Sequence, residues 1–265
     1  MLNTNLSTGE LQFRKLSDDK LERIHAASLE ILERTGLRLF EEQALELLKS
    51  KGITVEDGNR VRIPSHLVEW ALSTAPKRTI LYDRHGRDAM HLEGNSMFYG
   101  TGSDCPNVID LHSGERRPGL LQDVVEATRV CDALPNIDFL MSFCIANELD
   151  PQTYDRHQMR AMLMHSLKPI LFVTLDFSGC LDAIKMAEAV AGGAEALQCK
   201  PLCACYINVS GALRHNAEAL QKLLFMAEKG LPTTYTPVVL RGATGPITAA
   251  GAIALANAGE LAGLV

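Results

Sequence analysis

The sequence predicts an α/β protein: a (β/α)8 TIM-type barrel of which only about half is present, preceded by an N-terminal α+β segment. Three observations predict it. From about Met97 onward, apolar strands alternate with helices. The four main strands are expected to begin at residues 139, 170, 202 and 233, so each unit repeats after 31 or 32 residues. The first glycine-rich loop lacks the nucleotide-binding pattern, because Cys105 stands where its third glycine belongs.

Residues 1–96 are predicted as a separate N-terminal segment of small helices and hairpins that packs against the larger part. A polar tail is followed by a helix whose apolar stripe runs from Leu21 to Leu32 and which ends at Gly36. The other elements expected here are a helix over Glu41–Lys51, a hairpin turning at Asp57-Gly58-Asn59, a helix over Ser65–Ala75 and a hairpin from Thr79 to Leu92.

Residues 97–265 are predicted as the first half of the barrel. A short strand, Met97–Tyr99, and a helix over Leu121–Leu134 open it. Four strand–helix pairs follow, expected at Phe139–Ile145 with Tyr154–Ser166, Ile170–Leu175 with Cys180–Ala191, Leu202–Val209 with Asn216–Lys229, and Thr233–Val239 with Ile247–Leu264. A complete barrel takes about 250 residues. We therefore expect a piece of a longer protein, and the alternative is a half-barrel completed by a second copy.

Composition excludes several function classes. The net charge of -6 argues against a nucleic-acid partner, because phosphate binding needs a concentrated basic surface. No apolar run is long enough for a membrane span, and the N-terminal residues do not resemble a secretory peptide. The seven cysteines form no disulfide framework, which indicates reduced thiols and a cytoplasmic location.

Functional residues of a parallel barrel lie at the carboxyl ends of its strands and in the loops that follow. This rule selects five segments, which are Gly100–Cys105, Ala146–Glu148, Thr174–Asp176, Asn208–Gly211 and Leu240–Pro246. Two of them are rich in glycine and could bring backbone N–H groups close to a ligand: one contains Gly100 and Gly102, the other Thr244 and Gly245. The second leads into a helix whose N-terminus would favour a carboxylate or phosphate. Simple turn formation is the alternative for the first.

The sequence gives weaker support for a metal site or a catalytic serine. Cys199, Cys203 and Cys205 do not have the spacing of a structural zinc site, so we interpret them as buried thiols and predict no metal. The histidines do not pair at metal-binding spacing, and Ser210 lacks the glycine two positions before it that a nucleophile elbow requires.

Several stretches resemble the trimethylamine methyltransferase superfamily. These are Phe98–Ser103, Leu134–Asp138, Lys168-Pro169-Ile170 and, most specifically, Gly242–Thr248 running into Ala256-Asn257-Ala258. The resemblance implies the N-terminal half of a (β/α)8 barrel that moves a methyl group from a methylated amine to the Co(I) of a separate corrinoid protein. No cofactor would be bound directly, because the partner protein presents the corrinoid (cobalamin). We expect a member without pyrrolysine that acts on a quaternary amine of the glycine betaine type, with trimethylamine as the other candidate.

A quaternary ammonium is held by aromatic faces and a nearby carboxylate. The candidates for these roles near the expected site are Tyr99, Asp104, Glu148, Asp176, Tyr206 and Tyr235, together with the loop residues Gly100, Gly102, Thr244 and Gly245. The sequence leaves open whether Tyr206 and Tyr235 face the site or the helices. The alternative function is a non-catalytic half-barrel that binds a partner or dimerises. A lyase or aldolase would want a lysine within a main strand, and none is there.

Overall fold

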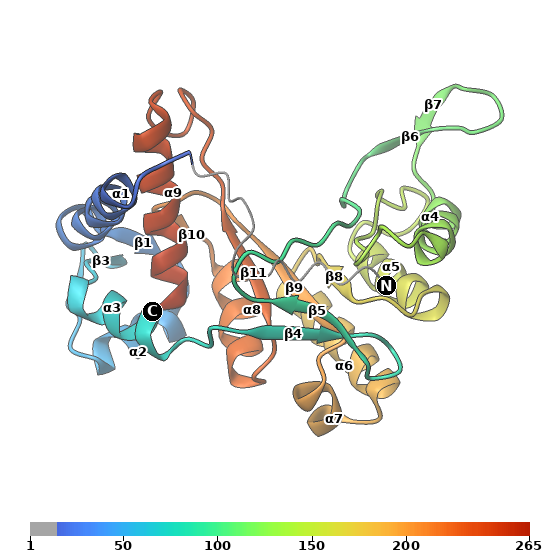
Figure 1. The fold of residues 1–265 in the computed structure, drawn as a ribbon, viewed down its shortest axis with the longest axis horizontal. Coiled ribbons are helices and arrows are strands. Elements are labelled where there is room, and N and C mark those ends of the chain that lie inside the picture. Colours follow the sequence, from blue (N-terminus) through green and yellow to red (C-terminus); the bar gives the residue numbers. More distant parts are fainter. Residues whose placement is uncertain (1–14) are drawn as a thin grey trace. The chain divides into compact units, whose positions relative to one another are not determined.

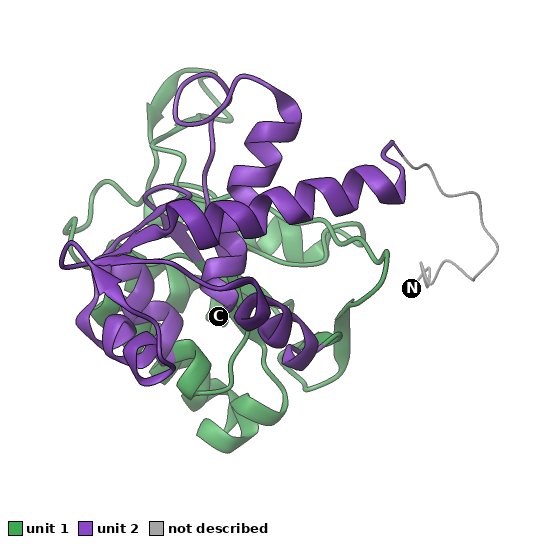
Figure 2. Cartoon of the chain, turned by 90° about the vertical axis from the view of Figure 1, so that its left-hand side faces the viewer, with its two compact units in different colours: residues 1–8, 77–206, 226–234 green, residues 9–76, 207–225, 235–265 purple. Residues whose placement is uncertain are grey.

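The computed structural model describes residues 15–265, so the first part of the polar N-terminal tail lies outside the described residues. The chain divides into two compact units (Figure 2). Among the described residues, unit 1 comprises 77–206 and 226–234, and unit 2 comprises 15–76, 207–225 and 235–265. Both units are therefore built from segments that are distant in sequence.

The chain folds as a mixed α/β protein with a parallel sheet (Figure 1). A three-stranded sheet has the order β11-β9-β8, with strands β8 (Ile170–Phe172), β9 (Cys203–Val209) and β11 (Thr233–Pro237). Isolated parallel bridges extend this arrangement, since Gly100 pairs with Phe139 and Leu140 pairs with Ile170. The described residues form no closed barrel.

Unit 1 places its helices beside these parallel segments. Helices α4 (Leu121–Ala133), α5 (Tyr154–His165) and α6 (Phe177–Ala191) pack in chain order, and the short α7 (Ala194–Cys199) packs on α6. Two antiparallel hairpins complete the unit: β4 (Thr79–Tyr82) with β5 (Asp88–Leu92), and β6 (Asn107–Ile109) with β7 (Arg116–Pro118).

The predicted helices of unit 1 are confirmed, whereas two of its predicted strands are wrong as regular elements. Met97–Tyr99 is not a strand, and Phe139–Ile145 makes only single bridges. The latter segment is interrupted because Phe143 adopts a positive φ of 66°, which no continuous strand accommodates. The β6–β7 hairpin and α7 were not predicted.

Unit 2 contains a four-stranded sheet of order β10-β1-β3-β2. Its helices are α1 (Asp18–Glu30), which continues as the π-helical turn η1 (Ile31–Thr35), α2 (Glu42–Ser50), α3 (Ser65–Thr74) and α9 (Ala249–Leu264). Its strands are β1 (Leu37–Leu39), β2 (Val55–Glu56), β3 (Arg60–Val61) and β10 (Arg214–His215). Helix α8 (Ala217–Glu228) begins in unit 2 and ends in unit 1. Gly36 ends the first helix as predicted, with a φ of 70° that favours glycine.

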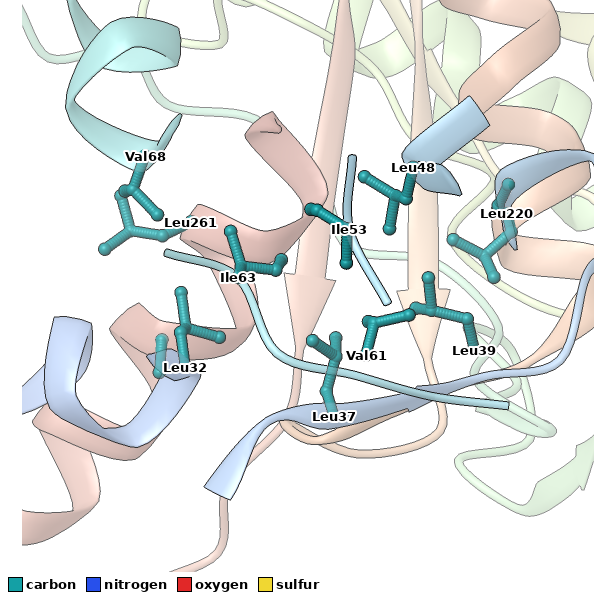
Figure 3. Close-up of a cluster of buried hydrophobic side chains, with 12 residues drawn as sticks. Leu32, Leu37, Leu39, Leu48, Ile53, Val61, Ile63, Val68, Leu220 and Leu261 are labelled. Atoms are coloured by element: carbon teal, nitrogen blue, oxygen red, sulfur yellow. The ribbon is translucent and has the colours of Figure 1, made fainter. Parts of the chain in front are cut away.

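The core of unit 2 joins residues from both ends of its sequence (Figure 3). Leu32, Leu37 and Val61 are almost completely buried, and they pack in one cluster with Leu220 and Leu261. Ser28 in α1 also donates a hydrogen bond of 2.9 Å to the carbonyl of Ala254 in α9. No helix within residues 15–265 has both the length and the apolar character needed to cross a membrane.

Candidate active site

Asp104 in the first glycine-rich loop of unit 1 interacts electrostatically with Tyr154 and Asp155 at the start of α5. Burial and the neighbouring Asp155 carboxylate raise the pKa of Asp104. Burial, and then the negative charges of Asp104 and Asp155, raise the pKa of Tyr154. The Asp155 charge thus acts on both Asp104 and Tyr154, and the Asp104 charge acts on Tyr154, which indicates that the three side chains lie within electrostatic range. Carboxylate charge beside a phenol ring is the combination that stabilises an organic cation.

The Asp155 carboxylate is buried and its hydrogen bonds are made within the protein. It accepts hydrogen bonds from the backbone N–H groups of Leu175 (3.0 Å) and Arg156 (2.8 Å) and from the Arg156 guanidinium (3.0 Å). Asp104, by contrast, accepts one long hydrogen bond of 3.4 Å from the Ser103 hydroxyl. Of the two carboxylates, Asp104 is therefore the one with oxygens suited to an external cation.

Arg156 ties the start of α5 to the start of α6. Its guanidinium donates to Asp182 (2.8 Å) and to the Ser178 hydroxyl (2.7 Å), and it lies 3.6 Å from Asp176. Asp176 caps α6, because its side chain accepts a hydrogen bond of 2.7 Å from the backbone N–H of Gly179. The predicted residue Asp176 thus lies in the same charged network as Asp155.

Two non-glycine residues at this place have left-handed backbone conformations. Asp104 has a φ of 59° and Phe143 a φ of 66°. Their segments are hydrogen bonded, since Cys105 N–H donates to the Phe143 carbonyl (3.3 Å) and Phe143 N–H donates to the Gly102 carbonyl (2.9 Å). Such conformations cost about 1–3 kcal/mol each and gather at functional sites. The Phe143 side chain is 41% exposed, so it adds a second aromatic surface next to this loop.

The glycines of the first loop differ in what surrounds them, which gives a matched pair of variants. A Cβ on Gly100 would overlap the ring of Phe139, whereas a Cβ on Gly102 would meet nothing within 4 Å. We expect Gly100→Ala to lower the free energy of unfolding by about 1–2 kcal/mol, because the ring must move. We expect Gly102→Ala to leave it within about 0.5 kcal/mol. Urea titration of both variants measures this difference, and equal stabilities would contradict the close approach at Gly100.

Three other candidate residues of unit 1 have contacts outside the charged network of Asp155, Arg156 and Asp176. The Glu148 carboxylate accepts a hydrogen bond of 2.7 Å from the N–H of Leu121, and so stabilises the N-terminus of α4. Tyr99 is 63% exposed, and its backbone N–H donates to the Asp138 carboxylate (2.7 Å). Tyr206 is half-buried on β9.

The remaining predicted residues belong to unit 2. The Tyr235 hydroxyl lies 2.9 Å from Nδ1 of His215, and its ring packs against Gly263 in α9. Tyr235 thus contacts a helix, which is the alternative that the sequence left open. Burial raises the pKa of its phenol. Burial lowers the pKa of His215 to about 4, so this imidazole is neutral at pH 7.

The second glycine-rich loop, Leu240–Pro246, is closed by its own hydrogen bonds. The Thr244 hydroxyl accepts a hydrogen bond of 2.9 Å from Leu240 N–H, and Gly245 packs tightly against Val239. The following helix starts at Ala249, two residues later than predicted, and the Thr248 side chain caps it through Gly251 N–H (3.3 Å). Thr244 and Gly245 therefore shape the loop itself.

Sequence reasoning missed Phe143, Tyr154 and Asp155. Phe143 lies in a segment that the sequence predicts to be a regular strand, and the other two begin a predicted helix directly after a predicted loop. Extending the search from the loops to the first turn of each following helix would have found Tyr154 and Asp155. The interpretation of the cysteines holds for Cys203 and Cys205, which are buried, and is wrong for Cys199, which is exposed. Residues 15–265 contain no cluster of three potential metal ligands.

Unit 1 also contains a cavity of about 320 Å³. It lies against the β4–β5 hairpin and is lined mainly by apolar side chains, among them Leu81, Met90, Phe139 and Leu171. None of the candidate residues of the sequence analysis lines it. The candidate site therefore rests on the Asp104 network rather than on this cavity.

Comparison with known proteins gives one family. Residues 3–265 match the family model described as trimethylamine methyltransferase (MTTB). Trimethylamine methyltransferase MttB of Desulfitobacterium hafniense (strain DSM 10664 / DCB-2) is 29% identical over 94% of this chain and 50% of its own length. Glycine betaine methyltransferase of D. hafniense (strain Y51) is 28% identical over 96% of this chain and 53% of its own length. The chain thus spans about half the length of the curated relatives it matches.

Among the solved structures similar to this chain is that of a hydroxylamine MtmB complex. It aligns with a TM-score of 0.44 and 13% sequence identity, covering 82% of this chain and 51% of the other.

Proposed function

Because the chain belongs to the trimethylamine methyltransferase (MTTB) family, we propose that the protein moves a methyl group from a methylated amine to the Co(I) of a corrinoid held by a separate protein. The match over residues 3–265 carries this proposal. We further propose that the parallel segments of this chain form half of a (β/α)8 barrel, and that the whole protein acts on a quaternary amine such as glycine betaine or on trimethylamine.

For a quaternary amine the chemistry requires little acid or base catalysis. The methyl carbon is attacked in line by Co(I) of the acceptor, the C–N bond breaks, and its electron pair remains on nitrogen. A neutral tertiary amine leaves without a proton transfer. The protein's task is to position the amine, exclude water and stabilise its positive charge before transfer.

Within unit 1, Asp104 and Tyr154 are the residues that we propose for holding the cation. A cation–π contact supplies about 0.5–2 kcal/mol. The Asp104 carboxylate adds a direct charge interaction, while Asp155 increases the negative potential from its buried position. The other candidate residues are secondary. In unit 1 they are Tyr99, Gly100, Gly102, Phe143, Glu148, Asp176 and Tyr206. In unit 2 they are Tyr235, Thr244 and Gly245.

The test uses the complete polypeptide that contains this sequence. It is incubated with chemically reduced cob(I)alamin and, in separate reactions, glycine betaine, trimethylamine and tetramethylammonium. The absorbance change that accompanies methylcobalamin formation, together with mass detection of the demethylated amine, measures the reaction. Methylation with one of these amines supports the proposal. Its absence with all three, both with free cobalamin and with a purified corrinoid protein, would favour the non-catalytic alternative.

We expect Asp104→Asn to weaken binding of the amine substrate about tenfold, because the variant loses the charge nearest the cation. The wild-type affinity should rise with pH through the raised pKa of Asp104, since only the ionised carboxylate attracts a quaternary ammonium whose own charge is constant. Isothermal titration at several pH values measures both effects.

Glu126→Gln serves as the control, because it removes an exposed carboxylate on α4. It should bind as the wild type does. An Asp104→Asn variant with wild-type affinity and an unchanged pH dependence would remove Asp104 from the site.

A further inference from the structure

Two cysteines of unit 1 are paired directly through the backbone beside the candidate site. Cys105 and Cys144 form an isolated parallel bridge. Cys105 N–H donates to the Phe143 carbonyl (3.3 Å), and the Cys105 carbonyl accepts from Ile145 N–H (2.9 Å). Cys105 directly follows Asp104 in the sequence, and Cys144 directly follows Phe143. The pair therefore joins the two segments that contain the left-handed residues of the site.

The spacing of this pair suits a disulfide. Neighbouring strands lie about 4.7–4.9 Å apart, and directly paired residues project to the same face of a sheet. Disulfides join Cα atoms that are separated by about 4.4–6.8 Å. Burial, and then the negative charges of Asp123 and Cys105, raise the pKa of the Cys144 thiol to about 11, so the two thiols lie within electrostatic range. Cys105 and Cys144 can therefore be linked without a rearrangement of the fold.

The surroundings of the two thiols give each a different part in such a reaction. Cys144 is completely buried, packs with Val124 and Ala161, and is protonated at pH 7. Cys105 is exposed and adjoins Asp104, which the amine substrate must reach if the proposed function is correct. Hydrogen peroxide is smaller than a methylated amine, so it can reach the same place. Cys105 is therefore the thiol that reacts first, and Cys144 is the thiol that closes the disulfide.

We propose that Cys105 and Cys144 are a redox pair, which a peroxide oxidises to a disulfide that prevents amine binding at Asp104. This inference rests on the proposed function for the role of Asp104. In the first step the Cys105 sulfur attacks a peroxide oxygen, the O–O bond breaks, and a sulfenic acid and one water result. In the second step the Cys144 sulfur attacks the Cys105 sulfur, the S–O bond breaks, and a second water leaves. Two thiols are oxidised and one peroxide is reduced to two waters.

The disulfide acts on the site through the position of Asp104. The bond brings the two sulfur atoms to about 2.05 Å from each other, so the backbone of both segments must adjust. Asp104 has a φ of 59° and Phe143 a φ of 66°, and both are hydrogen bonded through the same short stretch. A displacement of about 1 Å at a positioning residue can lower the rate of a reaction about a hundredfold. We therefore expect oxidation to weaken amine binding at least about tenfold.

The experiment uses the complete polypeptide that contains this sequence. It is treated with hydrogen peroxide at pH 7 and then with an alkylating reagent that blocks the remaining thiols. Peptide mapping by mass spectrometry should find Cys105 and Cys144 in one disulfide, which dithiothreitol reduces. Isothermal titration with glycine betaine, trimethylamine and tetramethylammonium, each in turn, then compares the amine Kd of the oxidised, reduced and re-reduced protein. The Kd should rise at least about tenfold on oxidation and return after dithiothreitol.

Three variants test the parts of the mechanism, each compared with its own reduced form. Cys105→Ser should bind the amine equally before and after peroxide treatment. Cys144→Ser should stop at the sulfenic acid of Cys105, which dimedone labels. Cys199→Ser is the matched control, because Cys199 is an exposed thiol outside the pair. It should form the disulfide and lose amine affinity as the wild type does.

The outcomes separate this inference from the proposed function. If peroxide leaves Cys105 and Cys144 free or oxidises them separately, or if their disulfide forms and the amine Kd is unchanged, the redox pair is wrong. A disulfide between Cys180 and Cys205 in its place, whose buried sulfur atoms lie 4.0 Å apart, would also overturn it. If the reduced wild type methylates neither free cobalamin nor a corrinoid protein, the proposed function fails, while the peptide map still decides whether the disulfide forms.

Discussion

Replacing Arg156 with alanine should lower the free energy of unfolding by about 3 kcal/mol at pH 7. The Asp155 carboxylate, 3% exposed, would lose its adjacent cation and retain only its backbone hydrogen bonds. A buried carboxylate without its partner is costly, because the charge was removed from water in exchange for that interaction. The variant would also release the link from α5 to Asp182 in α6. Guanidinium chloride titration followed by circular dichroism measures the effect.

Arg160→Ala provides the control for this experiment. Arg160 is exposed one turn further along α5, so its loss should change the unfolding free energy by no more than about 0.5 kcal/mol. If Arg156→Ala proves as stable as Arg160→Ala, the Arg156 network does not stabilise the start of α5. In that case the position of Tyr154 and Asp155 would depend on packing alone.

Acidification from pH 7 to pH 4 should remove on the order of 3 kcal/mol of stability through His215 alone. The imidazole is completely buried and its pKa is lowered to about 4, against about 6.5 in an unfolded chain. The unfolded state therefore binds the proton more readily between these values. Stability is fully present above about pH 6.5 and is lost as the pH falls towards 4.

His215→Gln separates this contribution from that of the carboxyl groups. Glutamine keeps a donor for the Ala212 carbonyl and an acceptor for the Tyr235 hydroxyl, the two partners of His215, but it does not titrate. Its unfolding free energy should fall less between pH 7 and pH 4 than that of the wild type. His157→Gln, at an exposed position of α5, should leave the pH dependence unchanged. Identical pH profiles for wild type and His215→Gln would contradict a buried neutral imidazole.

The sequence was most informative where apolar periodicity alone determines an element. Helices such as α4 and α5 begin as predicted, because apolar residues at helical spacing mark their extent in the sequence and these apolar faces pack against one another. The strand predicted at Phe139–Ile145 failed for a backbone reason. An apolar run predicts an extended chain, whereas the positive φ of Phe143 depends on hydrogen bonds to the loop at Gly102 and Cys105, which no local pattern reveals.

The candidate site was predictable in part for a similar reason. The rule that functional residues follow barrel strands led to Asp104 and Asp176. It did not lead to Asp155, whose significance comes from burial and from contacts with Leu175 and Arg156. The β6–β7 hairpin does have a local signal in the sequence: Asp110 and Gly114 are residue types that favour a turn.

The core of unit 2 has a consequence for how the chain is made. Leu32 and Leu37 reach their buried positions by packing in a cluster that includes Leu220 and Leu261, and β1 pairs with β10 at Arg38 and Arg214. On a ribosome that adds about 5–20 residues per second, the N-terminal apolar residues wait on the order of ten seconds or more for these partners. Unit 1 joins mostly nearby helices, so its parts can associate earlier. During synthesis, helix α1 thus emerges long before the residues that cover it, and it is a segment on which a chaperone would act.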